Sequence, residues 1–351
     1  MPSFAVVGAG AIGGYLGTLL AAGGEPVTFI ARGANLAAIR DRGMTVTLED
    51  GREVVARHVR ACASLAEAGA HDVVLLTVKA HQVADVAPEL PRLFHQDTAL
   101  VTMQNGIPWW YFQRHGGPLD GMPVHAADPD GSITRTVEPT RIIGSIVYPA
   151  ATLVAPGVVR VVEGRRFTLG ELDGSISPRI QMIAQNLTKA GFKAPITKDI
   201  RGEIWLKLLG NLSLNPLSAL THATLVDLLQ FPLTRDLCAA MMREGEAVAA
   251  KLGITLPVSI ERRMAGAERV GAHKTSMLQD VEQGKHPEIE ALVGAVVELG
   301  RATDVPTPRI EAVYACVSLL AKTLADQDAK VVLEPAARGS TPHATNDARA
   351  T

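Results

Sequence analysis

The stretch AVVGAGAIGGYLGTLL, residues 5–20, decides the fold of the first half of this chain. An apolar run precedes Gly8 and another follows Gly13, which predicts a strand, a glycine turn and a helix. Gly8, Gly10 and Gly13 form a GxGxxG motif at that turn. The first glycine permits the tight turn, the second lets a pyrophosphate approach the backbone, and the third lets helix and strand pack closely. The motif predicts a dinucleotide site formed by Gly8, Ala9, Gly10, Ala11, Ile12 and Gly13.

Strand-like and helix-like segments alternate through the first half of the chain. Continuous apolar runs occupy 4–7, 27–31, 72–79 and 99–106. Apolar strands separated by helices are typical of a parallel sheet that is buried on both faces. Residues 44–48 and 54–59 are joined by a turn signal and predict a hairpin.

From about residue 200 the chain contains only helical patterns. Segments with a 3.6-residue apolar period run through 201–230, 233–252, 258–283, 287–303 and 307–327. We predict an α/β fold with an N-terminal Rossmann-type NADP-binding domain at 1–198 and a C-terminal all-helical substrate and catalytic domain at 199–330. Residues 331–351 lack periodicity and predict a disordered tail. The cleft between the domains is the expected place for chemistry.

The composition excludes several classes of function. A net charge of −2 does not provide the basic surface that nucleic acid requires. The histidines show no paired spacing such as HExxH, so no metal is expected. Residues 2–24 are uncharged but glycine-rich and lack a basic start, so we expect no membrane span. The widely spaced Cys62, Cys238 and Cys316 suit a reducing cytoplasm, and Cys316 falls in an apolar pattern that predicts a core position.

The residue after the second predicted strand indicates the choice of cofactor. An NAD site usually places Asp or Glu there, to bind the ribose hydroxyls. Here Arg32 occupies that point, and no carboxylate lies between residues 26 and 38. A guanidinium can bind a 2′-phosphate through two hydrogen bonds, which favours NADP(H). The alternative is an ordinary solvated arginine at a strand end.

Polar residues also follow the next two predicted strands. Lys79 and Gln82 come at the end of one, and Asn105 comes at the end of the other. Open α/β sheets bind their ligands at this carboxyl edge. The alternatives are a solvated lysine and a tight Asn-Gly turn.

Three polar residues form a stripe on the apolar segment 204–221. Lys207, Asn211 and Asn215 recur at steps of four, and each step drifts by only about 40° around a helix. Such a stripe either faces solvent or lines a cleft, and asparagine is a poor helix former for a solvent face. Pro216 predicts a kink just after the stripe.

A second polar cluster lies within residues 275–294. Gly284 and Pro287 should divide it into two helices, with Glu288 in the first turn of the second. A carboxylate at that position is also ordinary chemistry for a helix N-terminus. Ser276 is either functional or a surface hydroxyl.

Five motifs together resemble the ketopantoate reductase family (2-dehydropantoate 2-reductases). They are, in chain order, GAGAIGG, LLTVKAHQ, QNG, the KxxxNxxxNPLSAL run and SMLQDVEQGKHPEIE. The resemblance covers the chain from Phe4 to about Leu324. It implies an enzyme that reduces 2-dehydropantoate to pantoate with NADPH, in the cytoplasm, on the route to pantothenate.

The resemblance also implies roles for individual residues. Lys207 matches the family's catalytic lysine, which donates a proton to the keto oxygen as hydride arrives. Glu288 matches the glutamate that bonds the product hydroxyl. The remaining matches are substrate contacts at Asn211, Asn215 and Ser276 and cofactor contacts at Arg32, Lys79, Gln82 and Asn105.

The chain departs from compact family members in an expanded segment at 106–147. Trp109 and Trp110 follow Asn105 closely and could reshape the substrate pocket, which favours another branched or aryl 2-oxo acid as the alternative substrate. Otherwise the indoles belong to a surface loop that packs against the second domain or a partner subunit. A third hypothesis is an NADP(H)-binding sensor without turnover, although a pure binder needs no proton donor. The apolar helical half is compatible with a homodimer.

Overall fold

The strand, glycine turn and helix expected at the amino end are present. In the computed structural model, which describes residues 1–334, β1 (Phe4–Val7) is followed by the turn and by α1 (Ala11–Ala22). Every residue of β1 is buried. The predicted tail at 331–351 falls mostly outside the described residues, and its described part, 331–334, has no regular secondary structure.

The main sheet has seven strands in the order β11-β8-β7-β6-β1-β2-β5. These strands are β2 (Val27–Ile30), β5 (Arg60–Cys62), β6 (Val73–Leu76), β7 (Ala99–Thr102), β8 (Ile142–Val147) and β11 (Phe167–Glu171). All neighbours are parallel except β11, which runs antiparallel to β8. The strand order reverses between β1 and β6, so a ligand crevice is expected at their carboxyl ends.

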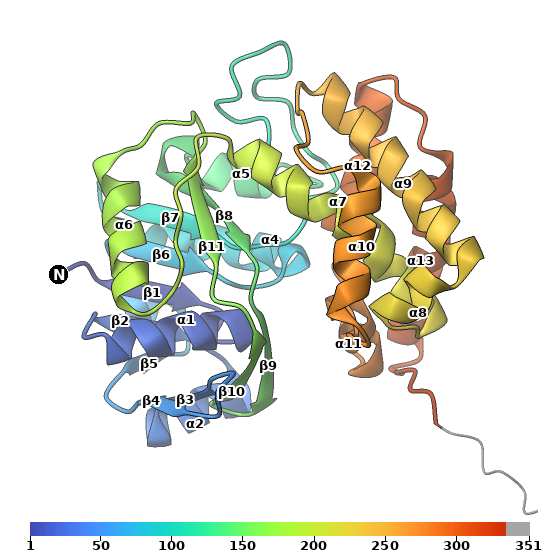
Figure 1. Ribbon diagram of the computed structural model, residues 1–351. Helices are drawn as coiled ribbons and strands as arrows, with labels where there is room; N and C mark the ends of the chain where they lie inside the picture. Colours follow the sequence, from blue (N-terminus) through green and yellow to red (C-terminus); the bar gives the residue numbers. More distant parts are fainter. Residues whose placement is uncertain (335–351) are drawn as a thin grey trace, which may run out of the picture.

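A second sheet has the order β4-β3-β10-β9 and lies beside α1 (Figure 1). Its strands are β3 (Met44–Thr47), β4 (Glu53–Ala56), β9 (Ala150–Ala155) and β10 (Val158–Glu163). The predicted hairpin is confirmed, because β3 and β4 pair antiparallel. A Cβ on Gly14 would meet Met44 Cε at 2.6 Å and Val159 Cγ2 at 2.8 Å, so α1 packs directly on this sheet.

Helices cover both faces of the main sheet. Phe4 and Val6 share one core cluster with α1 and α6 (Pro178–Lys189), whereas Ala5 and Val7 belong to the cluster on the opposite face. The shorter helices of this half are α2 (Gly33–Arg42), α3 (Leu65–Ala68), η1 (Ala80–Gln82), α4 (Val83–Val86), η2 (Ala87–Leu93), α5 (Ser132–Thr136) and η3 (Pro139–Arg141). Because side chains on both faces of β1 are buried, its sequence is apolar at every position.

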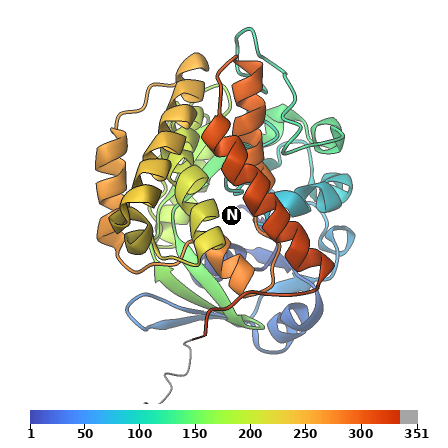
Figure 2. The same ribbon diagram turned by 90° about the vertical axis from the view of Figure 1, so that its right-hand side faces the viewer.

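The second half consists of helices that stack side by side (Figure 2). They are α7 (Ile200–Thr221), α8 (Leu225–Gln230), α9 (Pro232–Lys251), α10 (Ile260–Val270), α11 (Ser276–Glu282), α12 (Ala295–Ala302) and α13 (Pro308–Asp326). The first of them, α7, packs against the main sheet, since a Cβ on Gly144 or Gly170 would lie 2.7 Å from Ile200. Helix α7 therefore connects the two halves.

Two local expectations for this half need correction. The periodic segments 201–230 and 258–283 each contain two helices, which separate at His222 (φ 59°) and near Gly271 (φ 83°). Cys316 is exposed and not part of the core. Among residues 1–334, no helix is both long enough and apolar enough to span a membrane.

Candidate active site

The glycine turn leaves no room for side chains where α1 approaches β1. Gly8 adopts φ 101°, and a Cβ on Gly13 would lie 2.2 Å from the Gly8 carbonyl oxygen and 2.4 Å from Thr77 Oγ1. Gly10 caps α1 without a side-chain hydrogen bond, and a Cβ there would meet nothing within 4 Å. The free N–H groups of Ala11 and Ile12 in the first turn therefore face an open approach. This arrangement fits a pyrophosphate at a helix N-terminus.

Two residues flank this turn on the side of β2. Ala9 is buried, and its carbonyl oxygen accepts a 2.6 Å hydrogen bond from Asn35 Nδ2. Arg32 occupies the N-cap position of α2, just after β2, and is exposed. Within the described part of the chain its guanidinium has no hydrogen-bond or ion-pair partner. It is therefore free to bind an anion at the same sheet edge as the glycine turn.

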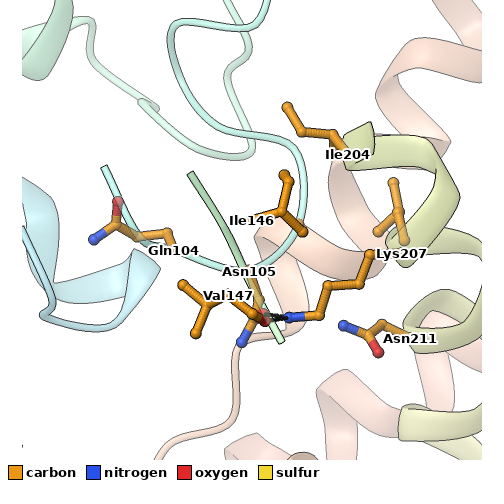
Figure 3. A pocket seen from close by; sticks show the side chains of 9 residues that line it. Gln104, Asn105, Ile146, Val147, Ile204, Lys207 and Asn211 are labelled. Atoms are coloured by element: carbon orange, nitrogen blue, oxygen red, sulfur yellow. Dashed lines mark hydrogen bonds between the residues drawn. The ribbon is translucent and has the colours of Figure 1, made fainter. Parts of the chain in front are cut away.

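A pocket opens where the ends of β7 and β8 meet α7 (Figure 3). One part of its wall is polar and another is aliphatic. The lining residues are Gln104, Asn105, Gly106, Ile146, Val147, Ile204, Lys207, Leu208 and Asn211. The pocket thus combines groups from the carboxyl edge of the sheet with groups from the helical half.

Lys207 extends from α7 toward the end of the sheet (Figure 3). Its Nζ donates a 2.6 Å hydrogen bond to Asn105 Oδ1 and a second hydrogen bond to the Val147 carbonyl oxygen. Burial of the ammonium lowers the pKa of Lys207 to about 8, although the nearby charge of Glu288 acts in the opposite direction. A lysine with this pKa gives up its proton more readily than an exposed lysine.

Glu288 reaches the same place from the other polar cluster. Its Oε1 accepts a 2.9 Å hydrogen bond from the Ala80 backbone N–H, and its Oε2 accepts a 3.4 Å hydrogen bond from Asn105 Nδ2. The Asn105 amide therefore lies between Lys207 and Glu288 and contacts both. Glu288 itself precedes the next helix, which begins with a π-helical turn, η4 (Glu290–Gly294), so its expected position in the first helical turn is wrong.

The polar stripe of α7 continues along the cleft. Asn211 lines the pocket one turn after Lys207. Asn215 is buried one turn further, and its Nδ2 donates a 3.4 Å hydrogen bond to Ser276 Oγ. Ser276 is the exposed first residue of α11. The stripe therefore faces other residues of the cleft and not open solvent.

The two remaining sequence candidates lie on the loop after β6. Lys79 Nζ forms a 2.5 Å ion pair with Asp280 Oδ1, and Gln82 is exposed, with its Oε1 accepting a 3.2 Å hydrogen bond from the Lys79 backbone N–H. Sequence reasoning missed Asp280. The available signal was its position four residues after Ser276, which places both on one face of α11.

The two tryptophans do not line the pocket. Trp109 and Trp110 are buried in the core, and Trp110 Nε1 donates a 2.9 Å hydrogen bond to Thr102 Oγ1. The expectation that they reshape the pocket is therefore wrong. The aliphatic wall comes instead from Ile146, Val147, Ile204 and Leu208, which sequence reasoning did not single out.

The variant Trp110→Phe tests this structural role. It should lower the free energy of unfolding by about 1–2 kcal/mol, because the Thr102 hydroxyl loses the indole N–H donor and packing volume is lost. The KM for the substrate should not change. Denaturant unfolding and steady-state kinetics measure the two quantities. A clear change in KM at unchanged stability would show that Trp110 contributes to the pocket.

The geometry defines a class of protein: a two-domain oxidoreductase in which a Rossmann crevice meets a lysine–glutamate site from a helical half. Residues 4–109 match the family model "Ketopantoate reductase PanE/ApbA", and residues 199–321 match "Ketopantoate reductase PanE/ApbA C terminal". The chain belongs to the ketopantoate reductase family. It is thus an enzyme of the 2-dehydropantoate 2-reductase type that uses a nicotinamide cofactor.

Individual relatives agree with this assignment. A 2-dehydropantoate 2-reductase of Mesorhizobium japonicum is 50% identical over 90% of this chain and 97% of its own length. A crystal structure from Ralstonia solanacearum MolK2 has a TM-score of 0.88 and 40% identity, covering 93% of this chain and 99% of that one. The structure of 2-dehydropantoate 2-reductase from Methylococcus capsulatus has a TM-score of 0.77 and 30% identity, covering 92% and 97%.

Proposed function

We propose that this protein reduces 2-dehydropantoate to pantoate, with NADPH as the hydride source and Lys207 as the proton donor. The observation that carries the proposal is the network Lys207–Asn105–Glu288 at the edge of the dinucleotide crevice. The name of the Mesorhizobium japonicum relative supports the substrate. The product places the reaction on the route to pantothenate.

The residues of the crevice fit NADP(H). The close approach at Gly13 and the uncapped first turn of α1 suit a pyrophosphate. The Arg32 guanidinium, which has no partner among residues 1–334, suits a 2′-phosphate. When bound, the reduced nicotinamide supplies the hydride. Every other contribution comes from side chains of this chain.

Lys207 is oriented to act as the general acid. An ammonium has three N–H donors, and Asn105 and the Val147 carbonyl oxygen accept two of them. The third is available to the keto oxygen of the substrate. As negative charge develops on that oxygen, the ammonium stabilises it and then transfers its proton. The lowered pKa of Lys207 favours this transfer near neutral pH.

The remaining groups hold the substrate in one orientation. Glu288 already accepts two hydrogen bonds that fix its carboxylate, and it can accept a third from the product hydroxyl. Asn211, Asn215 and Ser276 supply uncharged donors along the cleft for the substrate carboxylate. The aliphatic wall of the pocket suits the branched carbon chain of 2-dehydropantoate.

Steady-state kinetics with several 2-oxo acids test the substrate. 2-Dehydropantoate should give the highest kcat/KM, above a smaller branched 2-oxo acid and an aryl 2-oxo acid. If another acid were turned over hundreds of times more efficiently, the alternative substrate would replace the proposal. Absence of turnover with every acid would remove the reductase function altogether.

The pH dependence of kcat/KM tests the role of Lys207. A proton donor is active only when protonated, so kcat/KM should stay level below pH 8 and fall above it, because the pKa of Lys207 is about 8. The variant Glu288→Gln removes the charge that raises this pKa, so its alkaline limb should move to lower pH. An alkaline limb that remains near the ordinary lysine pKa would contradict the assignment.

We also infer a cytoplasmic location. The three cysteines support it, since Cys62, Cys238 and Cys316 are all unpaired thiols. The homodimer stays a prediction.

A further inference from the structure

The loop after β6 contacts the second polar cluster across the cleft, and we call this the interdomain contact (residues 79–81 with residues 280–288). Lys79 Nζ forms a 2.5 Å ion pair with Asp280 Oδ1 and donates a 3.3 Å hydrogen bond to the His286 carbonyl oxygen. The rings of His81 and His286 lie with centroids 4.8 Å apart. The contact therefore joins the sheet edge directly to the helical half.

Asp280 is a largely buried carboxylate that belongs to this contact. Its side chain is 15% exposed, and Lys79 is its only ion-pair partner in the described part of the chain. Burial raises the pKa of Asp280, whereas the ammonium of Lys79 lowers it. A buried carboxylate without a partner is costly, so the pair must be retained for the helix to pack here. Because it lies one helical turn after Ser276, Asp280 faces the cleft.

The ion pair with Asp280 leaves one N–H donor of the Lys79 ammonium available to a ligand. Of the three N–H groups on its ammonium, Asp280 accepts one and the His286 carbonyl oxygen accepts another. One N–H has no partner among the described residues. Lysine has a flexible four-carbon side chain, so an unrestrained ammonium would lose conformational entropy when it binds a ligand. The two hydrogen bonds already restrain the side chain, so less entropy is lost when the third bond forms.

We propose that Asp280 is a positioning residue: it holds the ammonium of Lys79 at the mouth of the cleft, where the remaining N–H binds an oxygen of the bound cofactor. Through this pair the helical half completes the cofactor site on the Rossmann half. The inference rests on the proposed use of NADPH.

A double-mutant cycle on cofactor binding tests the inference. Asp280→Asn keeps the size of the side chain but removes its charge, and it should raise the Kd for NADPH about fivefold to twentyfold. Lys79→Met should raise it at least as much, and the double variant should bind no more weakly than Lys79→Met alone. Fluorescence titration with NADPH in the absence of a 2-oxo acid measures each Kd. Asp280→Glu, which keeps the charge, should recover most of the affinity.

The matched control is Glu282→Gln, on the same helix. Glu282 pairs with Lys274 at 2.8 Å and not with Lys79, so this variant should leave the Kd unchanged. Additive effects of Asp280→Asn and Lys79→Met would overturn the inference. An unchanged or lower Kd for Asp280→Asn, with only a lower melting temperature, would overturn it too, because Asp280 would then serve stability alone. Failure of the wild-type protein to bind NADPH would instead overturn the proposed function.

Discussion

Lys207→Met should lower kcat/KM by about 10³-fold, because the reaction loses both its proton donor and the positive charge beside the developing alkoxide. Methionine nearly preserves the length of the side chain and suits the buried site, so the fold should be retained. The lysine carries a desolvated charge, as its lowered pKa shows, so the melting temperature should not fall. Steady-state kinetics with 2-dehydropantoate and NADPH measure the loss.

Two measurements distinguish a catalytic lysine from a structural one. The Kd of the variant for NADPH should remain close to that of the wild type, since Lys207 contacts Asn105 and Val147 and not the glycine turn. Lys251→Met, at the exposed end of α9, is the matched control and should be as active as the wild type. An unchanged rate for Lys207→Met would show that the proton comes from elsewhere. Loss of NADPH binding of the same size as the loss of activity would make Lys207 a cofactor-site residue.

Arg32→Ala should weaken NADPH binding by about 1.5–3 kcal/mol, which corresponds to roughly 10–150-fold in Kd, because a charge-assisted hydrogen bond to phosphate is lost. NADH lacks the 2′-phosphate, so its binding should change much less. Arg32 is exposed, and its guanidinium makes no hydrogen bond or ion pair within the described residues, so the substitution should not affect stability. Fluorescence titrations with the two cofactors give the ratio of the two effects.

The ratio of the two changes in Kd is the decisive quantity, since any general damage to the crevice would weaken the binding of both cofactors. Arg92→Ala serves as the control, because Arg92 is an exposed arginine paired with Glu89 at 2.5 Å on η2. It should leave both Kd values unchanged. Equal weakening of NADPH and NADH by Arg32→Ala would contradict the preference for NADPH.

The sequence by itself determined those features that depend on neighbours in the chain. The GxGxxG spacing specifies a turn in which Gly13 must approach Gly8 within contact distance, and no other residue type fits there. The apolar run of β6 predicts a strand covered on both faces, because every second side chain points to the opposite layer. The four-residue steps of Lys207, Asn211 and Asn215 place them on one helix face through helical geometry alone.

Some local patterns could not be interpreted without the packing around them. The apolar period of α13 includes Cys316, yet that side chain is exposed, because small apolar residues also occupy the outer face of this helix and periodicity cannot say which face is buried. Pro216 lies inside α7, which continues to Thr221, and the kink expected there stays a prediction. Trp109 and Trp110 are also buried in the core, which their position just after Asn105 in the sequence did not indicate.

Only the tertiary structure decided which distant groups meet. Asn105 on the sheet edge contacts both Lys207 and Glu288, which are separated from it by 102 and 183 residues. The pairing of Lys79 with Asp280 and the burial that sets the pKa of Lys207 arise in the same way. Periodicity and motifs report on residues a few positions apart. The contacts and desolvation that make a site chemically active depend on how the two halves pack.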